Sequence, residues 1–232
     1  MTKIITTTPR PIYKFLPLLI VLYFCIAIIG GIGFNKYISL GNSYAQAGTI
    51  IFPLFFILSD IIAEVYGYKI ARLVFWSTLI GLVTFAVFSY LIVQLPYPAI
   101  WHGEESYQFV FAHILRIEAS TAITLSCATI VNIYLITKWK ILMRGRYFWL
   151  RSLASSTIGE FIYTALNIFI ITVGIRPFKD ILTIIVWAYL FKVIYTVIFA
   201  YPAVLAAAFL KRVEKCDAYD YGTNFNPFRW SS

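Results

Sequence analysis

The chain has 232 residues, of which 61% are hydrophobic, 19% aromatic and only 12% charged, and its formal net charge is +9. A soluble core of this length could not bury so many apolar side chains, so this composition excludes an ordinary soluble domain and predicts a polytopic membrane protein.

Six long apolar runs predict transmembrane helices, because a hydrocarbon core of about 30 Å needs about 20 apolar residues per helix. The runs lie at residues 15–34, 48–65, 73–95, 117–137, 151–173 and 181–210. They do not show the alternation over about ten residues that marks the strands of a transmembrane barrel. We therefore predict an all-α membrane protein with six helices, which forms a single domain over residues 1–232 and ends in a cytoplasmic tail at 211–232.

The distribution of lysine and arginine predicts the orientation of these helices. Fourteen of these residues fall in the N-terminal arm, the second-to-third connection, the fourth-to-fifth region and the tail. The alternate connections contain only Lys36, Arg116, Arg176 and Lys179. Because positive charges concentrate on the cytoplasmic side, both termini should be cytoplasmic in a cell inner membrane. This orientation accounts for the net positive charge, so no nucleic-acid partner is needed to explain it.

The stretch LSDIIAEVYGYKIAR, at the end of the second run, carries two carboxylates in an apolar setting. Asp60 and Glu64 are four residues apart, which places them on one helix face where their charges repel. A cation, a proton or a watery cavity would relieve that repulsion, and Lys69 and Arg72 could supply the cation. Gly67 could end the helix. The alternative interpretation is a capped and solvated helix end.

Two charged residues lie near the middle of the fifth and sixth runs. Glu160 shares its helix face with Tyr163, Thr164 and Asn167, and Lys192 lies about eleven residues into the last run. A lone charge at this depth costs at least about 2.5 kcal/mol, so a salt bridge between Glu160 and Lys192 is expected. The pair is either a structural clamp or part of a polar pocket that recognises a substrate.

The fourth run contributes further polar groups. We expect Glu118 to lie at the membrane interface, and Asn132, which lies deeper toward the cytoplasmic side, to make a directional hydrogen bond. Ser120, Thr124 and Thr129 are small enough to let helices pack closely, which accounts for them without a binding role.

Neither the cysteines nor the histidines form a recognisable chemical motif. Cys25, Cys127 and Cys216 fall in two spans and the tail, and neither His102 nor His113 lies in a metal-binding pattern. The sequence therefore predicts no disulfide, no metal site, no cofactor and no enzymatic activity. The connection at 96–112 should lie outside the cell, either as a short interfacial helix or lid or as an aromatic anchor.

The motif FFILSDIIAEVYGYKIAR strongly resembles the signature of the queuosine precursor transporter family, also called the vitamin uptake transporter group. The resemblance covers about residues 15–212. Looser matches in the later spans are Ala119, Ser120, Arg151, Lys192, Tyr201 and Pro202.

This resemblance implies a six-helix bundle similar to the substrate-binding subunits of energy-coupling-factor vitamin transporters, working without an attached ATPase. Its members import cyano and aminomethyl deazaguanine precursors of queuosine, so the implied partners are a deazaguanine-like base and membrane lipid. The alternative is a substrate-binding subunit that needs a separate ATPase, and a homo-oligomer is left open. The candidate substrate-binding residues are Asp60, Glu64, Asn132, Glu160, Tyr163, Thr164, Asn167, Lys192 and Tyr195.

Two departures from the family pattern bear on the cargo. The fourth span has Ser126-Cys127 and Asn132 where the family commonly has Ser-Gln and then Asp, and the fifth has Tyr163-Thr164 in place of an Asp-Thr pair. Glu160, one turn earlier, could replace the missing carboxylate. A related heterocycle is therefore an alternative cargo.

Overall fold

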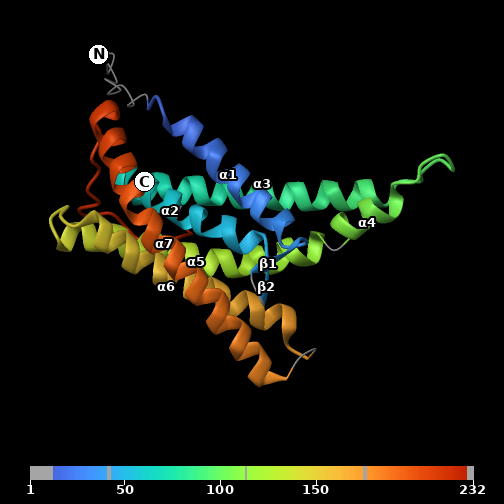
Figure 1. Ribbon diagram of the computed structural model, residues 1–232. Helices are drawn as coiled ribbons and strands as arrows, with labels where there is room; N and C mark the ends of the chain where they lie inside the picture. The colour runs from blue at the N-terminus through green and yellow to red at the C-terminus, as the bar shows by residue number, and fades with distance from the viewer. Residues whose placement is uncertain (1–12, 41–42, 113, 175–176, 229–232) are drawn as a thin grey trace, which may run out of the picture.

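The computed structural model describes residues 13–40, 43–112, 114–174 and 177–228 of the chain (Figure 1). Within these ranges it is almost entirely helical. In chain order the elements are α1 (Leu16–Gly33), β1 (Tyr37–Leu40), β2 (Ser43–Gln46), α2 (Gly48–Tyr66), α3 (Tyr68–Val93), α4 (Glu104–Phe111), α5 (Ile114–Leu142), α6 (Phe148–Thr172) and α7 (Phe178–Glu214).

Six of the helical segments are long and apolar enough to cross a membrane, which confirms the predicted all-α architecture with six transmembrane helices. One boundary differs from the prediction. Gly67 alone separates α2 from α3, and its φ of +83° lets the chain turn within a single residue. Gly67 thus ends the second helix as predicted. Lys69 and Arg72, expected in a longer connection, belong to the first turns of α3 instead.

Helix α2 forms the centre of the bundle. It packs against α1, α3, α5, α6 and α7, and most of its residues are buried (Figure 1). Aromatic side chains fill this contact zone: Tyr23 of α1 stacks on Phe55 with ring centroids 4.0 Å apart, and Phe52 stacks on Tyr163 of α6 at 4.5 Å. Any polar side chain on the inward face of α2 is therefore enclosed by other helices.

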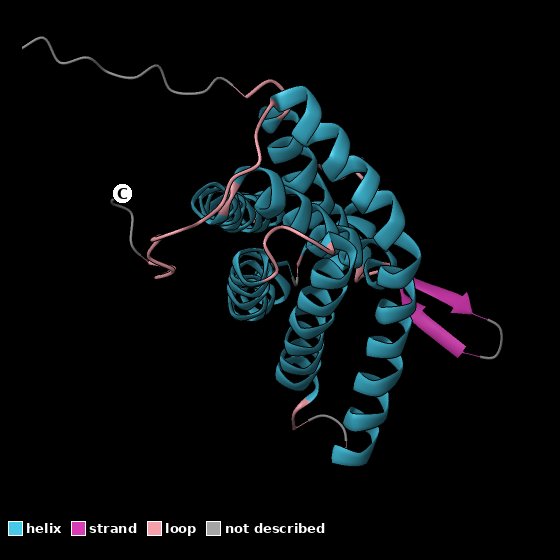
Figure 2. Ribbon diagram, turned by 90° about the vertical axis from the view of Figure 1, so that its left-hand side faces the viewer, coloured by secondary structure: helices cyan, strands magenta, loops and turns pink. Residues whose placement is uncertain are grey.

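Two of the connections between long helices contain small elements of secondary structure, a β-hairpin between α1 and α2 and a short helix between α3 and α5. Strands β1 and β2 pair antiparallel, with Tyr37 opposite Gln46, and project from the helices as a hairpin (Figure 2). No pattern in the sequence predicted this hairpin. The connection at 96–112 contains the eight-residue helix α4, which agrees with the short-helix alternative.

The segment after α7 is docked on one end of the bundle. The Asp220 carboxylate accepts a hydrogen bond of 2.9 Å from the backbone N–H of Tyr68, at the start of α3. The Tyr68 hydroxyl donates to the carbonyl of Phe225 at 2.7 Å, and Arg72 donates to the carbonyl of Asn226 at 2.6 Å. These contacts attach the tail to the start of α3. The sequence predicted a cytoplasmic tail but not its attachment to the helices.

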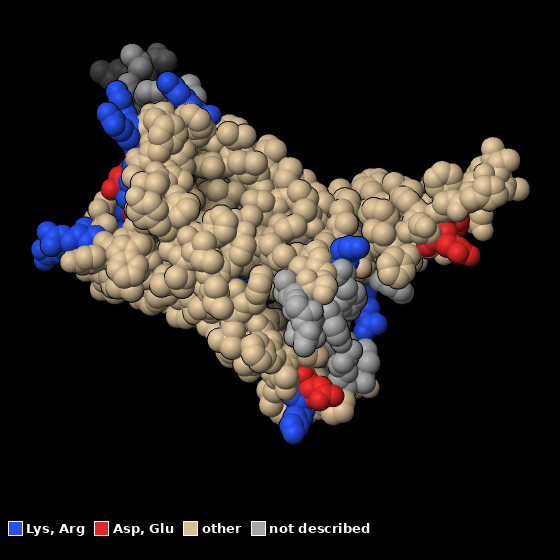
Figure 3. Space-filling view, viewed as in Figure 1, with Lys and Arg blue, Asp and Glu red and all other residues tan. Residues whose placement is uncertain are grey.

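Charged side chains are unevenly distributed over the surface. Figure 3 shows lysine and arginine gathered at the end of the molecule where α7 finishes and others near the start of α7, with a broad face between them that is almost free of charge. A wide uncharged band between charged ends is the pattern of a membrane protein.

Candidate functional site

Glu64 and Arg151 form a buried ion pair near the cationic end of the bundle. The Arg151 guanidinium donates from Nη1 to Oε2 of Glu64 at 2.8 Å and from Nη2 to Oε1 at 3.1 Å, and neither side chain has measurable exposure. Its Nε donates to the carbonyl of Arg146 at 3.0 Å. Two parallel charge-assisted bonds make this a bidentate pair that joins α2 to the start of α6.

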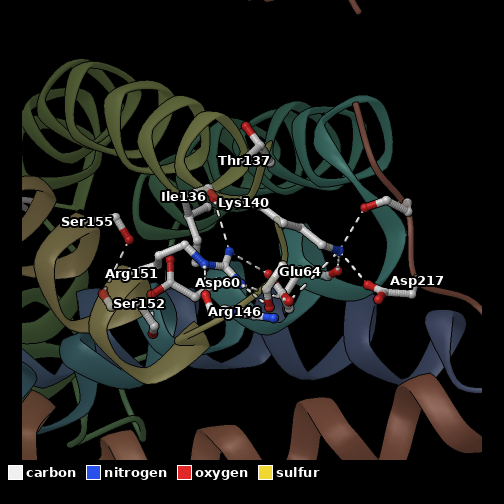
Figure 4. Close-up of polar contacts among 12 residues, drawn as sticks. Asp60, Glu64, Ile136, Thr137, Lys140, Arg146, Arg151, Ser152, Ser155 and Asp217 are labelled. Carbon is white, nitrogen blue, oxygen red and sulfur yellow. Dashed lines mark hydrogen bonds and ion pairs between the residues drawn. The ribbon is translucent and has the colours of Figure 1, made fainter. Parts of the chain in front are cut away.

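Two lysines complete the surroundings of Glu64, and Figure 4 shows one of them, Lys140, between Glu64 and Asp217. Lys211 of α7 donates to Oε1 at 2.6 Å, and Lys140 of α5 donates to the backbone carbonyl of Glu64 at 2.6 Å. Both lysines also bind Asp217 in the docked tail. The cations that neutralise Glu64 therefore come from other helices.

The prediction that Lys69 and Arg72 neutralise the carboxylates is wrong. Lys69 is exposed, and Arg72 binds the tail carbonyl of Asn226. Both residues lie beyond the turn at Gly67, so their helix runs in a different direction from the one that carries Glu64.

Asp60 is held by uncharged donors. Its Oδ2 accepts hydrogen bonds from Ser152 at 2.6 Å and Ser156 at 2.7 Å, and its Oδ1 accepts one from Asn132 at 2.8 Å. This confirms the directional hydrogen bond expected of Asn132. All these side chains are buried, so the alternative of a solvated helix end is wrong for both Asp60 and Glu64.

Together these hydrogen bonds and ion pairs form one network of polar side chains at this end of the bundle, which we call the inner lattice. It consists of Asp60, Glu64, Asn132, Lys140, Arg151, Ser152, Ser156, Lys211 and Asp217. Helices α2, α5, α6 and α7 all contribute to it. Two of its carboxylates, Glu64 and Asp217, form ion pairs with three cations, Lys140, Arg151 and Lys211, whereas Asp60 is bound by uncharged donors only. The carboxylate oxygens of Asp60 and Glu64 are therefore all bound by side chains of the protein itself.

Asp217 lies outside the membrane-spanning helices, and its titration reflects this lattice. Partial burial opposes its charge, but hydrogen bonds and Coulombic attraction from Lys140 and Lys211 outweigh burial and hold the pKa of Asp217 below its usual value. Asp217 therefore stays ionised and keeps the tail attached at neutral pH.

A second polar group lies farther along α6 and α7. Thr196 donates to Oε1 of Glu160 at 2.8 Å, and Lys192 donates to the hydroxyl of Thr164 at 2.9 Å. The structure contains no direct salt bridge between Glu160 and Lys192, so that prediction is wrong as a contact. The two side chains nevertheless stay close enough to interact electrostatically. Each of the two charged groups forms its direct hydrogen bond with a threonine hydroxyl instead of with the other charged group.

Of the other predicted substrate-binding residues, some lie in or beside the polar group around Glu160 and Lys192, and one does not. Tyr163 lies against it, with Nζ of Lys192 4.8 Å from the ring centroid. Asn167 donates to the hydroxyls of Ser120 and Thr124, which bridges α6 and α5. Tyr195 is only half-buried and stacks on Phe199 of its own helix, so the structure does not bring it into the group.

Sequence reasoning missed several members of these groups. Arg151 was counted as a charge beside the cytoplasmic connection, although it starts a serine-rich run whose members bind Asp60. Glu118 was expected at the interface but is only 3% exposed. Its position near the start of α5 suggested an interfacial residue, whereas α1 covers it.

These observations describe a helical membrane protein with charged and aromatic groups enclosed between its helices, which is the class of membrane carriers and channels. The model of the putative vitamin uptake transporter family matches residues 46–207, more than half of the chain, and the protein belongs to that family. It is therefore a multi-pass membrane transporter and not an enzyme.

A relative of known name supports the same assignment. The chain is 24% identical to the queuosine precursor transporter of Escherichia coli (strain K12) over 182 residues, which cover 76% of this chain and 79% of the relative. The resemblance to that family is thus confirmed. No solved structure matches the chain, and the expected similarity to energy-coupling-factor subunits stays a prediction.

Proposed function

We propose that the protein imports a deazaguanine-type precursor of queuosine, or a closely related base, across the inner membrane without an ATPase partner. The observation that carries this proposal is the position of Tyr163, whose buried ring lies against both Phe52 and Lys192 inside a transporter of this family. The similarity to a queuosine precursor transporter supports the cargo class.

The group around Tyr163 has the chemistry that a planar base requires. Aromatic rings stack on the faces of such a base, while carboxylate and hydroxyl oxygens accept from its N–H groups. Glu160 keeps one carboxylate oxygen without a hydrogen-bond partner among the described residues. The Lys192 ammonium has three donors, of which Thr164 takes one, so a second can reach a ring carbonyl.

In this proposal the inner lattice is the cytoplasmic gate. Helices α5, α6 and α7 are joined to α2 through Asp60 and Glu64, so a base can pass inward only when these contacts separate. Alternating access in carriers commonly moves one group of helices against another in this way. The cationic end of the molecule supports a cytoplasmic placement of both termini.

Complementation tests the proposed cargo. The chain is expressed in a bacterium that can neither make nor import queuosine precursors, the cyano or aminomethyl deazaguanine is supplied at low concentration, and queuosine is measured in tRNA. We expect the wild-type chain to restore queuosine and Glu160→Gln to lose most of that effect at equal protein level. Glu105→Gln is the matched control, because Glu105 is exposed on α4.

Proteoliposomes test whether the chain works alone. Purified protein should accumulate labelled cyano-deazaguanine without any other subunit. Folded, correctly inserted protein that accumulates nothing, yet restores queuosine in cells, would favour the alternative of a subunit that borrows an ATPase.

A further inference from the structure

Glu118 is a buried carboxylate that belongs neither to the inner lattice nor to the polar group around Glu160 and Lys192. It lies near the start of α5, is 3% exposed, and neither of its carboxylate oxygens has a hydrogen-bond partner among the described residues. Buried carboxylates are nearly always hydrogen-bonded, because desolvation without compensation is costly. By contrast, Asp60, Glu64 and Glu160 all accept hydrogen bonds from neighbouring helices.

Two consecutive glycines of α1 shape the surroundings of Glu118. A Cβ atom on Gly31 would collide with Oε1 of Glu118, and a Cβ on Gly30 would lie 2.8 Å from the ring of Phe52. The missing side chains therefore let the carboxylate and the aromatic ring rest directly on the backbone of α1. This places Glu118 and Phe52 along the same short stretch of one helix.

Tyr163 links these two side chains. Its ring stacks on Phe52 with an interplanar angle of 8°, and it lies close enough to Glu118 for a Coulombic interaction. The result is an aromatic pair with parallel faces beside a carboxylate that has both oxygens free. Because the two rings stack on each other, a flat heterocycle would stack on an outer face of the pair, and a carboxylate suits two donors that point the same way.

We propose that Glu118 is a substrate-binding residue that recognises the donor edge of a guanine-type base. One carboxylate oxygen accepts from the ring N–H and the other from the exocyclic amino group, while the base lies beside Phe52 and Tyr163. This inference rests on the proposed function and assigns the contact that distinguishes a guanine-type ring from a ring that lacks the amino group.

Binding to the purified, full-length protein tests the assignment. Isothermal titration compares 7-deazaguanine with 7-deazahypoxanthine, which differs by lacking the exocyclic amino group. For the wild type we expect at least about tenfold weaker binding of 7-deazahypoxanthine, since a hydrogen bond to a charged group is lost. In Glu118→Gln the affinity for 7-deazaguanine should fall about tenfold and the difference between the two compounds should largely disappear, because the amide has only one acceptor oxygen.

Two further variants separate binding from folding. Glu118→Met removes the polar group with an apolar side chain of similar size, and it should leave thermal unfolding of the ligand-free protein unchanged or raise the unfolding temperature while abolishing discrimination. Glu105→Gln, at an exposed site, should bind and discriminate like the wild type.

Glu118→Gln or Glu118→Met protein that keeps both the affinity and the preference for 7-deazaguanine overturns the assignment of Glu118 alone. Wild-type protein that is folded but binds neither compound overturns the proposed cargo, and this inference with it.

Discussion

Arg151 and Glu64 are fully buried partners joined by two hydrogen bonds of 2.8 and 3.1 Å, and this pair connects the central helix α2 to the start of α6. Lys211 adds a third donor to the same carboxylate from α7. One acidic side chain thus holds three helices together where the bundle closes.

Removing the arginine should strongly destabilise the protein. Arg151→Met leaves Glu64 buried with reduced compensation, and loss of one partner of a buried pair costs about 3–5 kcal/mol. The double variant Glu64→Gln/Arg151→Met should recover part of that loss, because no uncompensated charge then remains at the pair. Thermal unfolding of the detergent-solubilised proteins measures both effects. Arg146→Met serves as the control, since its side chain is exposed; equal losses at Arg146 and Arg151 would contradict the role of the pair.

Two adjacent serines provide a sharp comparison at Asp60. Ser156 donates to the Asp60 carboxylate at 2.7 Å, whereas Ser155 donates to the backbone carbonyl of Ser152 in its own helix at 3.2 Å, and both serines are fully buried. Ser156→Ala should destabilise by about 1.5–3 kcal/mol and Ser155→Ala by about 0.5–1.5 kcal/mol, because bonds to charged groups are stronger. The difference in unfolding free energy between the two variants is the readout. A Ser155→Ala loss as large as that of Ser156→Ala would argue against an ionised Asp60.

Attachment of the tail should depend on pH through Asp217. The pKa of this carboxyl is lower in the folded protein than in the unfolded chain. Its contribution to the stability of the docked tail is therefore complete above the unfolded pKa of about 4, and it is lost as the pH falls through the folded pKa. The hydrogen-exchange protection factors of the backbone after α7, which correct for the pH dependence of the intrinsic exchange rate, should therefore fall on acidification in the wild type. In Asp217→Asn the protection factors should be lower at neutral pH and change less with acidification. Identical pH profiles for the two proteins would show that another group controls the tail.

Gly31 should tolerate a methyl group only when Glu118 is shortened. Gly31→Ala places a Cβ against the Glu118 carboxylate, and overpacking of this kind typically costs about 1–3 kcal/mol. In the background of Glu118→Ala the same change should cost much less, because the colliding group is gone. A double-mutant cycle of unfolding free energies measures the coupling. Additive effects would mean that the two residues do not touch.

Several features could be predicted from the sequence because they depend on local properties of the chain. A run of apolar residues with the length of a membrane span forms a helix whatever its neighbours are, since no water is present to bind its backbone. Gly67 ends α2 because only glycine readily takes the positive φ that the turn requires. The expectation that Asp60 and Glu64 must be compensated also followed from charge and depth alone.

The partners of those carboxylates were decided by the tertiary structure. Glu64 meets Arg151 and Lys211, which are 87 and 147 residues away along the chain, and not the nearer Lys69 and Arg72. In lipid, the side of a helix that faces other helices is as apolar as the side that faces the acyl chains, so hydrophobic periodicity does not reveal which residues point inward. Glu118 lies near the start of its helix, where a sequence predicts an interfacial residue, and only the packing of α1 against it makes it buried. The sequence by itself determined a six-helix membrane protein with charges that needed partners, and only helix packing decided which partners those are.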